Sequence, residues 1–243
     1  MNGEDNTFLA GPRHSRRIIT IAAGLLVVLA VGVLLVVRAK DTAPQEPSPQ
    51  ANPSASPAPE ASPTGGSKTP LRLVHGKRTR NGIAVGYPHS AAGAVSAAIE
   101  YWAQLGSTLD PDRARKIGDT IAADDFEDAG DYLARGPSNS RRKLGLPTSG
   151  PLPEGSTMTL SPAAYQLRDQ SDDHMTVLLL SYLTTTTPSS GVLNRVGVFP
   201  IELAWQGDWR MRRPSGNDGD YLSLSRTPGS AEATAAGWQD FTQ

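Results

Sequence analysis

Five side chains with rings could line a binding pocket or an interface: His89, Tyr101, Trp102, Trp205 and Trp209. His89 stands directly before an expected helix, where an imidazole could bind a ligand or transfer a proton. No carboxylate and no second histidine lies near it in sequence, so we favour a turn histidine that bonds nearby backbone and fixes the start of the helix. The tryptophans could face a small molecule, but aromatic rings at sheet and helix packing positions more often belong to the core.

A run of carboxylates between residues 124 and 131 could coordinate a hard cation such as Ca²⁺ if it lay on one helix face. No Asp-x-Asp-x-Asp-Gly loop accompanies the run, and we prefer a solvated acidic face near a helix start. The chain has no cysteine and four histidines, which argues against thiolate chemistry and against a histidine metal site. We therefore predict no metal and no cofactor. The carboxylates concerned are Asp124, Glu127, Asp128 and Asp131.

Positive charge gathers in two short clusters, residues 77–80 and 141–143, which could touch an acidic polymer, lipid head groups or DNA. Neither cluster has the interleaved aromatic residues that single-strand binders use, and the net charge is −1, so we predict no direct nucleic-acid binding. The sequence contains no Gly-x-Ser-x-Gly, P-loop, Rossmann or His-Glu-x-x-His pattern. No motif names a reaction, and we expect a protein that is not an enzyme.

The elements that must position these residues follow a long uncharged stretch, residues 18–37, which predicts a transmembrane helix. At about 1.5 Å per residue it spans the roughly 30 Å of a bilayer core. A cleaved signal peptide is the alternative, but its apolar part is usually about 7–15 residues and thus shorter. The arginines before the stretch favour a cytoplasmic tail over residues 1–17 and an extracellular C-terminal part.

Prolines dominate the next stretch, with eight of them between residues 41 and 70. This composition cannot bury apolar area and predicts a disordered, polyproline-like linker, which we extend over residues 38–81. Residues 82–214 are then expected to form one extracytoplasmic domain of common size. Residues 215–243 are expected to form a flexible C-terminal tail.

Within the domain, the residue pattern predicts helices first and strands after. Ser90 and Asp110 are the expected N-caps of two helices, the second with a proline at its first position. We expect helices over residues 90–106, 110–119 and 121–133, and strands over residues 158–170, 174–187, 191–205 and 208–212. A tight turn at Gly207-Asp208 joins the last two strands, with Asp208 exposed and Trp209 in the core. This order predicts an α+β fold with helices on one face of a curved antiparallel sheet.

Two segments carry a resemblance to known proteins. The hairpin Ala204-Trp205-Gln206-Gly207-Asp208-Trp209-Arg210-Met211 resembles the aromatic strand, Gly-Asp turn and Trp-Arg strand that end many NTF2-like, cystatin-related domains. The segment from Gly82 to Val95 resembles a motif of actinobacterial membrane-anchored proteins, in which a Gly-Tyr-x-His-Thr-like turn precedes a Gly-Ala-Val helix. Ser90 stands where threonine is commoner and keeps a hydroxyl cap. With its tail, span and spacer, the whole layout resembles VirB8/TcpC-type conjugation proteins of Gram-positive bacteria.

The resemblance implies an NTF2-like cone and a non-enzymatic scaffold subunit that assembles into oligomers. We therefore expect a single-pass membrane protein whose extracytoplasmic domain is a scaffold or interaction subunit of a conjugative DNA-transfer or secretion apparatus. The expected partners are the lipid bilayer, other channel subunits and further copies of the chain.

The alternative is an extracytoplasmic small-molecule binder or NTF2-like enzyme that uses the open end of the cone. A cone filled with Leu, Val and Trp side chains would favour the interaction subunit, and an open polar pocket would favour the alternative. The side chains available to an enzyme are Tyr101, Tyr165, Tyr182 and Asp169.

Overall fold

The computed structural model describes residues 69–214 and 221–243. The transmembrane helix predicted over residues 18–37 and most of the predicted linker lie outside this part of the chain. Among the described residues, no helix combines the length and the apolar character needed to cross a membrane.

A four-stranded antiparallel sheet in the order β4-β5-β6-β7 forms the centre of the fold. Its strands are β4 (Thr157–Arg168), β5 (His174–Thr187), β6 (Gly191–Trp205) and β7 (Trp209–Met211). The middle of β5 is a Val- and Leu-rich run that is buried on both faces, as its composition favours. The predicted strands agree with these bounds to within two residues, and the α+β class is confirmed.

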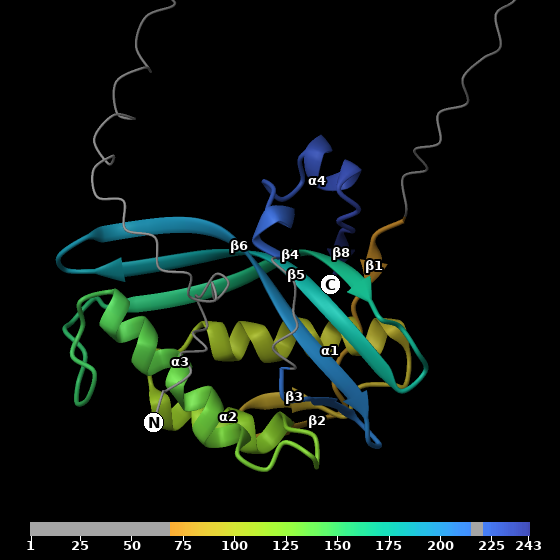
Figure 1. Ribbon diagram of the computed structural model, residues 1–243, viewed down its shortest axis with the longest axis horizontal. Helices are drawn as coiled ribbons and strands as arrows, with labels where there is room; N and C mark the ends of the chain where they lie inside the picture. The colour runs from red at the N-terminus through yellow and green to blue at the C-terminus, as the bar shows by residue number, and fades with distance from the viewer. Residues whose placement is uncertain (1–68, 215–220) are drawn as a thin grey trace, which may run out of the picture. The chain divides into compact units, whose positions relative to one another are not determined.

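Helix α1 (Ala91–Gly106) lies along one face of the sheet (Figure 1). Ser90 caps it as predicted, because its Oγ accepts a hydrogen bond from the Gly93 N–H at 3.1 Å. One side of α1 packs against the β5 and β6 side chains that point toward it, so this layer is filled by apolar groups. They are Val95, Tyr101, Trp102 and Leu105 from the helix and Val177, Leu179, Ile201 and Leu203 from the sheet.

Helices α2 (Pro111–Ile121) and α3 (Ala129–Lys143) pack against each other. The prediction of a third helix over residues 121–133 is wrong, because α3 begins eight residues later than expected and runs on to Lys143. After α2 the chain runs beside β7 instead of continuing as a helix. The Ala123 N–H donates to the Met211 carbonyl at 2.8 Å.

The C-terminal segment, residues 221–243, covers the face of the sheet opposite α1 (Figure 1). It contains η1 (Tyr221–Leu224) and α4 (Ala231–Ala235). Trp238 is 5% exposed and packs in a second core cluster with apolar side chains of β4, β5 and β6. This differs from the flexible tail expected from the sequence. The physical reason is β5, whose apolar second face needs a cover.

Residues 69–81, expected as the end of the linker, also take part in the fold. Strand β1 (Leu71–Arg72) pairs in parallel with β8 (Phe241–Thr242), and β2 (Arg78–Arg80) forms an antiparallel hairpin with β3 (Ile83–Val85). The expected domain boundary at residue 82 therefore falls inside the turn of the β2–β3 hairpin.

Candidate functional site

The two motifs singled out in the sequence meet at one end of the sheet. We name this meeting the motif junction, formed by residues 86–90 and 205–209. Trp209 is its centre and is 0% exposed, as expected of a core residue. Its Nε1–H donates to the Pro88 carbonyl at 2.9 Å, and its own carbonyl accepts from the Tyr101 hydroxyl at 2.9 Å. The junction thus joins the start of α1 to the β6–β7 hairpin.

Asp208 occupies the hairpin turn and is 1% exposed, so the expectation of an exposed Asp208 is wrong. Its Oδ2 accepts from the Gly86 N–H at 2.6 Å, and its Oδ1 accepts from the N–H groups of Tyr87 and Trp209 at 2.9 Å each. Three donors satisfy the buried carboxylate, which would otherwise be costly to remove from water. Burial, followed by the negative charge of Asp208, raises the pKa of Tyr101 above its usual range.

Gly93 allows the backbone to approach closely at the junction. A Cβ at this position would lie 2.0 Å from the Pro88 carbonyl oxygen. The same oxygen accepts from the Ser90 N–H and from Trp209 Nε1–H, each at 2.9 Å. The glycine of the Gly-Ala-Val helix start is therefore required for packing, because only glycine leaves room for the Pro88 carbonyl.

His89 lies at the surface of the junction, with its side chain 41% exposed. Its ring stacks on Trp205, with ring centroids 4.3 Å apart and ring planes 9° apart. Its Nε2 lies 2.7 Å from the Asp172 carbonyl oxygen and 3.1 Å from Asp173 Oδ1. The ring face thus packs against the end of β6, and Nε2 holds the start of α1 against the β4–β5 turn, as the turn-histidine interpretation expects. The neighbouring carboxylate comes from a segment 84 positions away in sequence.

The two hairpin tryptophans occupy directly opposed positions, since Trp205 pairs with Trp209. Their rings meet edge to face, with centroids 5.5 Å apart. Trp102 lies elsewhere, over the middle of β6, where its Nε1–H donates to the Pro200 carbonyl at 3.0 Å. The structure therefore brings four of the five pocket or interface candidates together at the motif junction, where they contact one another, and places Trp102 elsewhere.

The four carboxylates predicted to share a helix face do not share one. Asp124 and Asp128 lie in the connection before α3, whereas Asp131 lies in its first turn. Asp131 pairs with Arg115 at 3.0 Å, and Asp128 pairs with Arg213, whose hydrogen bond is the main cause that lowers the pKa of Asp128. No group of three or more His, Cys, Asp or Glu in residues 69–214 and 221–243 is placed to hold a metal ion.

The basic cluster at residues 141–143 forms the last turn of α3. Arg141 is 6% exposed, and its guanidinium donates to the carbonyls of Leu109 at 2.5 Å and Gly150 at 2.9 Å. Its role is to hold the loop after α3. The cluster at residues 77–80 is exposed along β2.

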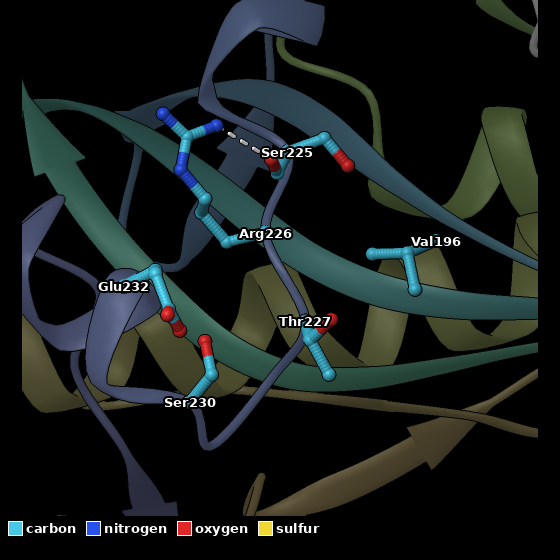
Figure 2. A pocket seen from close by; sticks show the side chains of 6 residues that line it. All are labelled: Val196, Ser225, Arg226, Thr227, Ser230 and Glu232. Carbon is cyan, nitrogen blue, oxygen red and sulfur yellow. Dashed lines mark hydrogen bonds between the residues drawn. The ribbon is translucent and has the colours of Figure 1, made fainter. Parts of the chain in front are cut away.

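A hollow of about 400 Å³ lies where the C-terminal segment passes Val196 of β6 (Figure 2). Its polar side chains build local structure: Arg226 donates to the Ser225 carbonyl at 2.7 Å, and the Ser230 hydroxyl caps α4. The Glu232 pKa is lowered, first by its own backbone N–H and then by Ser230. The hollow is lined by Val196, Ser225, Arg226, Thr227, Ser230 and Glu232.

Sequence reasoning missed the roles of Asp208, Gly93 and Arg141. Asp208 follows a glycine in a two-strand turn, a pattern typical of exposed hairpin loops. Two of its three donors come from residues more than 120 positions earlier, and local patterns carry no trace of such contacts. The available clue was that both unusual motifs, each rich in glycine and aromatic residues, occur in one domain.

Comparison with known proteins places the chain in a family. A family model with the description Domain of unknown function (DUF8175) matches residues 36–238. Since this match covers more than half of the 243 residues, the chain belongs to that family. The matched range includes both halves of the motif junction and the C-terminal segment as far as Trp238. No curated protein and no solved structure matches the chain.

Proposed function

We propose that this member of the DUF8175 family is a membrane-anchored, extracytoplasmic interaction subunit with an NTF2-like domain, and not an enzyme. The observation that carries the proposal is the filled layer between α1 and the sheet. Val177, Leu179 and Ile201 are each at most 2% exposed there and face the buried side of the helix. A small-molecule binder of this layout would need that space for its ligand.

Two of the three phenols that could serve an enzyme, Tyr101 and Tyr165, support the same conclusion. The Tyr101 hydroxyl donates to the Trp209 carbonyl at 2.9 Å, and the Tyr165 hydroxyl donates to Gln239 Oε1 at 3.2 Å. Both hydroxyls thus hold parts of the fold together. Burial raises the pKa of each phenol, so neither is prepared to act as a base near neutral pH.

Membrane anchoring and the choice of apparatus rest on the sequence. The uncharged stretch at residues 18–37, the arginines before it and the proline-rich spacer after it support a domain held outside the cytoplasm. The resemblance to VirB8/TcpC-type proteins supports subunits of a conjugative DNA-transfer or secretion apparatus as the partners.

Protease treatment of protoplasts that produce the full chain tests the topology. We expect loss of a C-terminal tag and protection of an N-terminal tag, whereas release of an intact domain into the medium would show a cleaved signal.

Deletion of the gene tests the role. We expect loss of DNA transfer or of secretion, restored by the full chain, and unchanged transfer and secretion would contradict the proposal.

A small-molecule screen tests the alternative function on the same material. An interaction subunit with a filled interior should keep its melting temperature across a panel of metabolites. A ligand that raises the melting temperature in a concentration-dependent way would contradict the proposal and favour a binding protein.

A further inference from the structure

Strand β6 has an outer edge whose peptide groups can be assigned from the register. The Trp205 N–H donates to the Asp173 carbonyl at 2.8 Å. Because hydrogen bonding alternates along an antiparallel pair, the odd-numbered residues of β6 direct their peptide groups toward β5. The even-numbered residues direct theirs outward, away from the sheet.

The C-terminal half of this outer edge is closed. Ala204 pairs with Arg210 of β7, and the Glu202 carbonyl accepts from the Arg212 N–H at 2.9 Å. Pro200 has no N–H to offer, and its carbonyl accepts from Trp102 Nε1–H at 3.0 Å. Each of these positions is therefore paired, capped or without a donor.

The N-terminal half is different, and we name residues 192–198 the open edge. No described residue pairs with the outward peptide groups of this stretch. Val192 is 69% exposed and Leu193 is 38% exposed, which makes them two of the three exposed large hydrophobic residues in the described part of the chain. Figure 1 shows the β5–β6 hairpin reaching beyond α3, with β6 at the margin of the sheet.

An unpaired edge of this kind is a template for another strand, and natural proteins usually block it with proline, lysine or a covering segment. The open edge contains no proline and no lysine, and Arg195 is its single charged residue. Its side chains are a mixture of apolar and small polar groups on both faces of the sheet. It therefore has the composition of a pairing surface.

We propose that the open edge pairs, antiparallel, with the open edge of a second copy of this chain around a twofold axis at Asn194. The inference deepens the proposed function, on which it rests, because it names a second copy as one partner of the interaction subunit. The pairing would extend the sheet across both copies and give outward peptide groups of this stretch hydrogen-bond partners.

The residue order suits this twofold pairing. When Asn194 of one copy lies opposite Asn194 of the other, Val192 of each copy lies opposite Val196 of the other. Arg195 of each copy then lies opposite Leu193 of the other. Apolar cross-strand pairs of this kind stabilise a sheet, whereas like charges directly opposite each other destabilise it. A twofold axis at Arg195 would place two guanidinium groups directly opposite each other. An axis at Asn194 avoids this clash, and this self-complementarity favours a second copy over a foreign strand.

Cysteine cross-linking on the full chain in membranes tests the proposal, because the natural sequence has no cysteine. Hydrogen-bonded antiparallel pairs bring Cα atoms to about 5.5 Å, within the range of a disulfide. Asn194→Cys should therefore give a disulfide-linked dimer on mild oxidation. The matched control is Val192→Cys, on the same edge and also exposed, which faces Val196 of the copy in this register and should stay monomeric.

The outcomes separate this proposal from the proposed function. A dimer from Asn194→Cys but not from Val192→Cys, at wild-type melting temperature, supports the twofold pairing. Equal cross-linking of both variants, or of neither, overturns it. A cross-link from Asn194→Cys to a different protein also overturns the second copy as occupant, while the interaction function stands. A stabilising small molecule would instead remove the proposed function.

Discussion

Strands β4 and β6 each present a long edge of the same sheet, and the chain protects the two edges unequally. On β4, the Leu160 N–H donates to Ser107 Oγ at 3.0 Å, and Pro162 has no N–H. Tyr165 exchanges two backbone hydrogen bonds of 2.9 Å with Gln239. Every one of these devices blocks the addition of another strand.

The closed half of β6 uses the same kinds of device, with Pro200, the Trp102 indole and β7 in succession. Only the open edge, residues 192–198, has none of them within the described part of the chain. This contrast supports the proposal that the exposed stretch pairs with another strand. The difference predicts two classes of substitution: those that cost stability and those that cost association.

The largest expected effect is on the hairpin that closes half of β6. Trp209→Ala should lower the free energy of unfolding by about 3–5 kcal/mol, since it empties a fully buried site. Denaturant unfolding of the purified full chain measures this loss. A variant that melts like wild type but no longer binds a ligand or partner would contradict the core role of Trp209.

Asp208→Ala should have the next largest effect and lower the free energy of unfolding by about 2–4 kcal/mol. It leaves the buried N–H donors of Gly86, Tyr87 and Trp209 without their acceptor. Asp208→Asn is the matched control and should lose less, since it keeps one acceptor oxygen and the shape of the side chain. Equal unfolding midpoints for Asp208→Ala and wild type would show that the turn does not depend on this carboxylate.

Tyr101→Phe should cost about 1 kcal/mol near neutral pH through the lost bond to the Trp209 carbonyl. It should also change alkaline stability. The folded-state pKa of Tyr101 is raised, chiefly by burial. The stability that the neutral phenol contributes is therefore fully present below about pH 10, and it is lost as the pH rises toward the folded-state pKa. Between about pH 8 and 11, the free energy of unfolding should fall less steeply with pH for Tyr101→Phe than for wild type. Parallel curves for both proteins would refute this assignment.

Ser107→Ala tests the β4 edge directly. It removes the acceptor of the Leu160 N–H and should cost about 1 kcal/mol. Asn194→Thr, at an exposed position of the open edge, should change the free energy of unfolding by less than about 0.5 kcal/mol. If the two substitutions had the same effect in denaturant titrations, the distinction between closed and open edges would lose its energetic basis.

The local features of the fold could be predicted from the sequence. Alternating and continuous apolar runs gave β5 and β6 their bounds, and the hydroxyl and carboxylate before α1 and α2 identified their N-caps. The wrong start predicted for α3 shows the limit. The stretch around residues 121–128 looks like a helix start, but Ala122 and Ala123 pair with Met211 of β7 instead.

Features that depend on distant segments were not predictable. The donors to Asp208 and the C-terminal cover over the second face involve contacts between residues far apart in sequence. The open edge belongs to the same class. Residues 192–198 read as an ordinary strand, and only the order of strands in the sheet shows that nothing described lies beside them.

Sedimentation of the full chain in detergent tests the central claim, that closed edges hold the fold while the open edge holds a second copy. Asn194→Pro removes one outward N–H from the open edge without removing a bond to β5, and Asn194→Thr keeps that N–H. We predict that wild type and Asn194→Thr sediment as dimers and Asn194→Pro as a monomer that still unfolds cooperatively. Dimeric Asn194→Pro, or monomeric wild type, would contradict the claim.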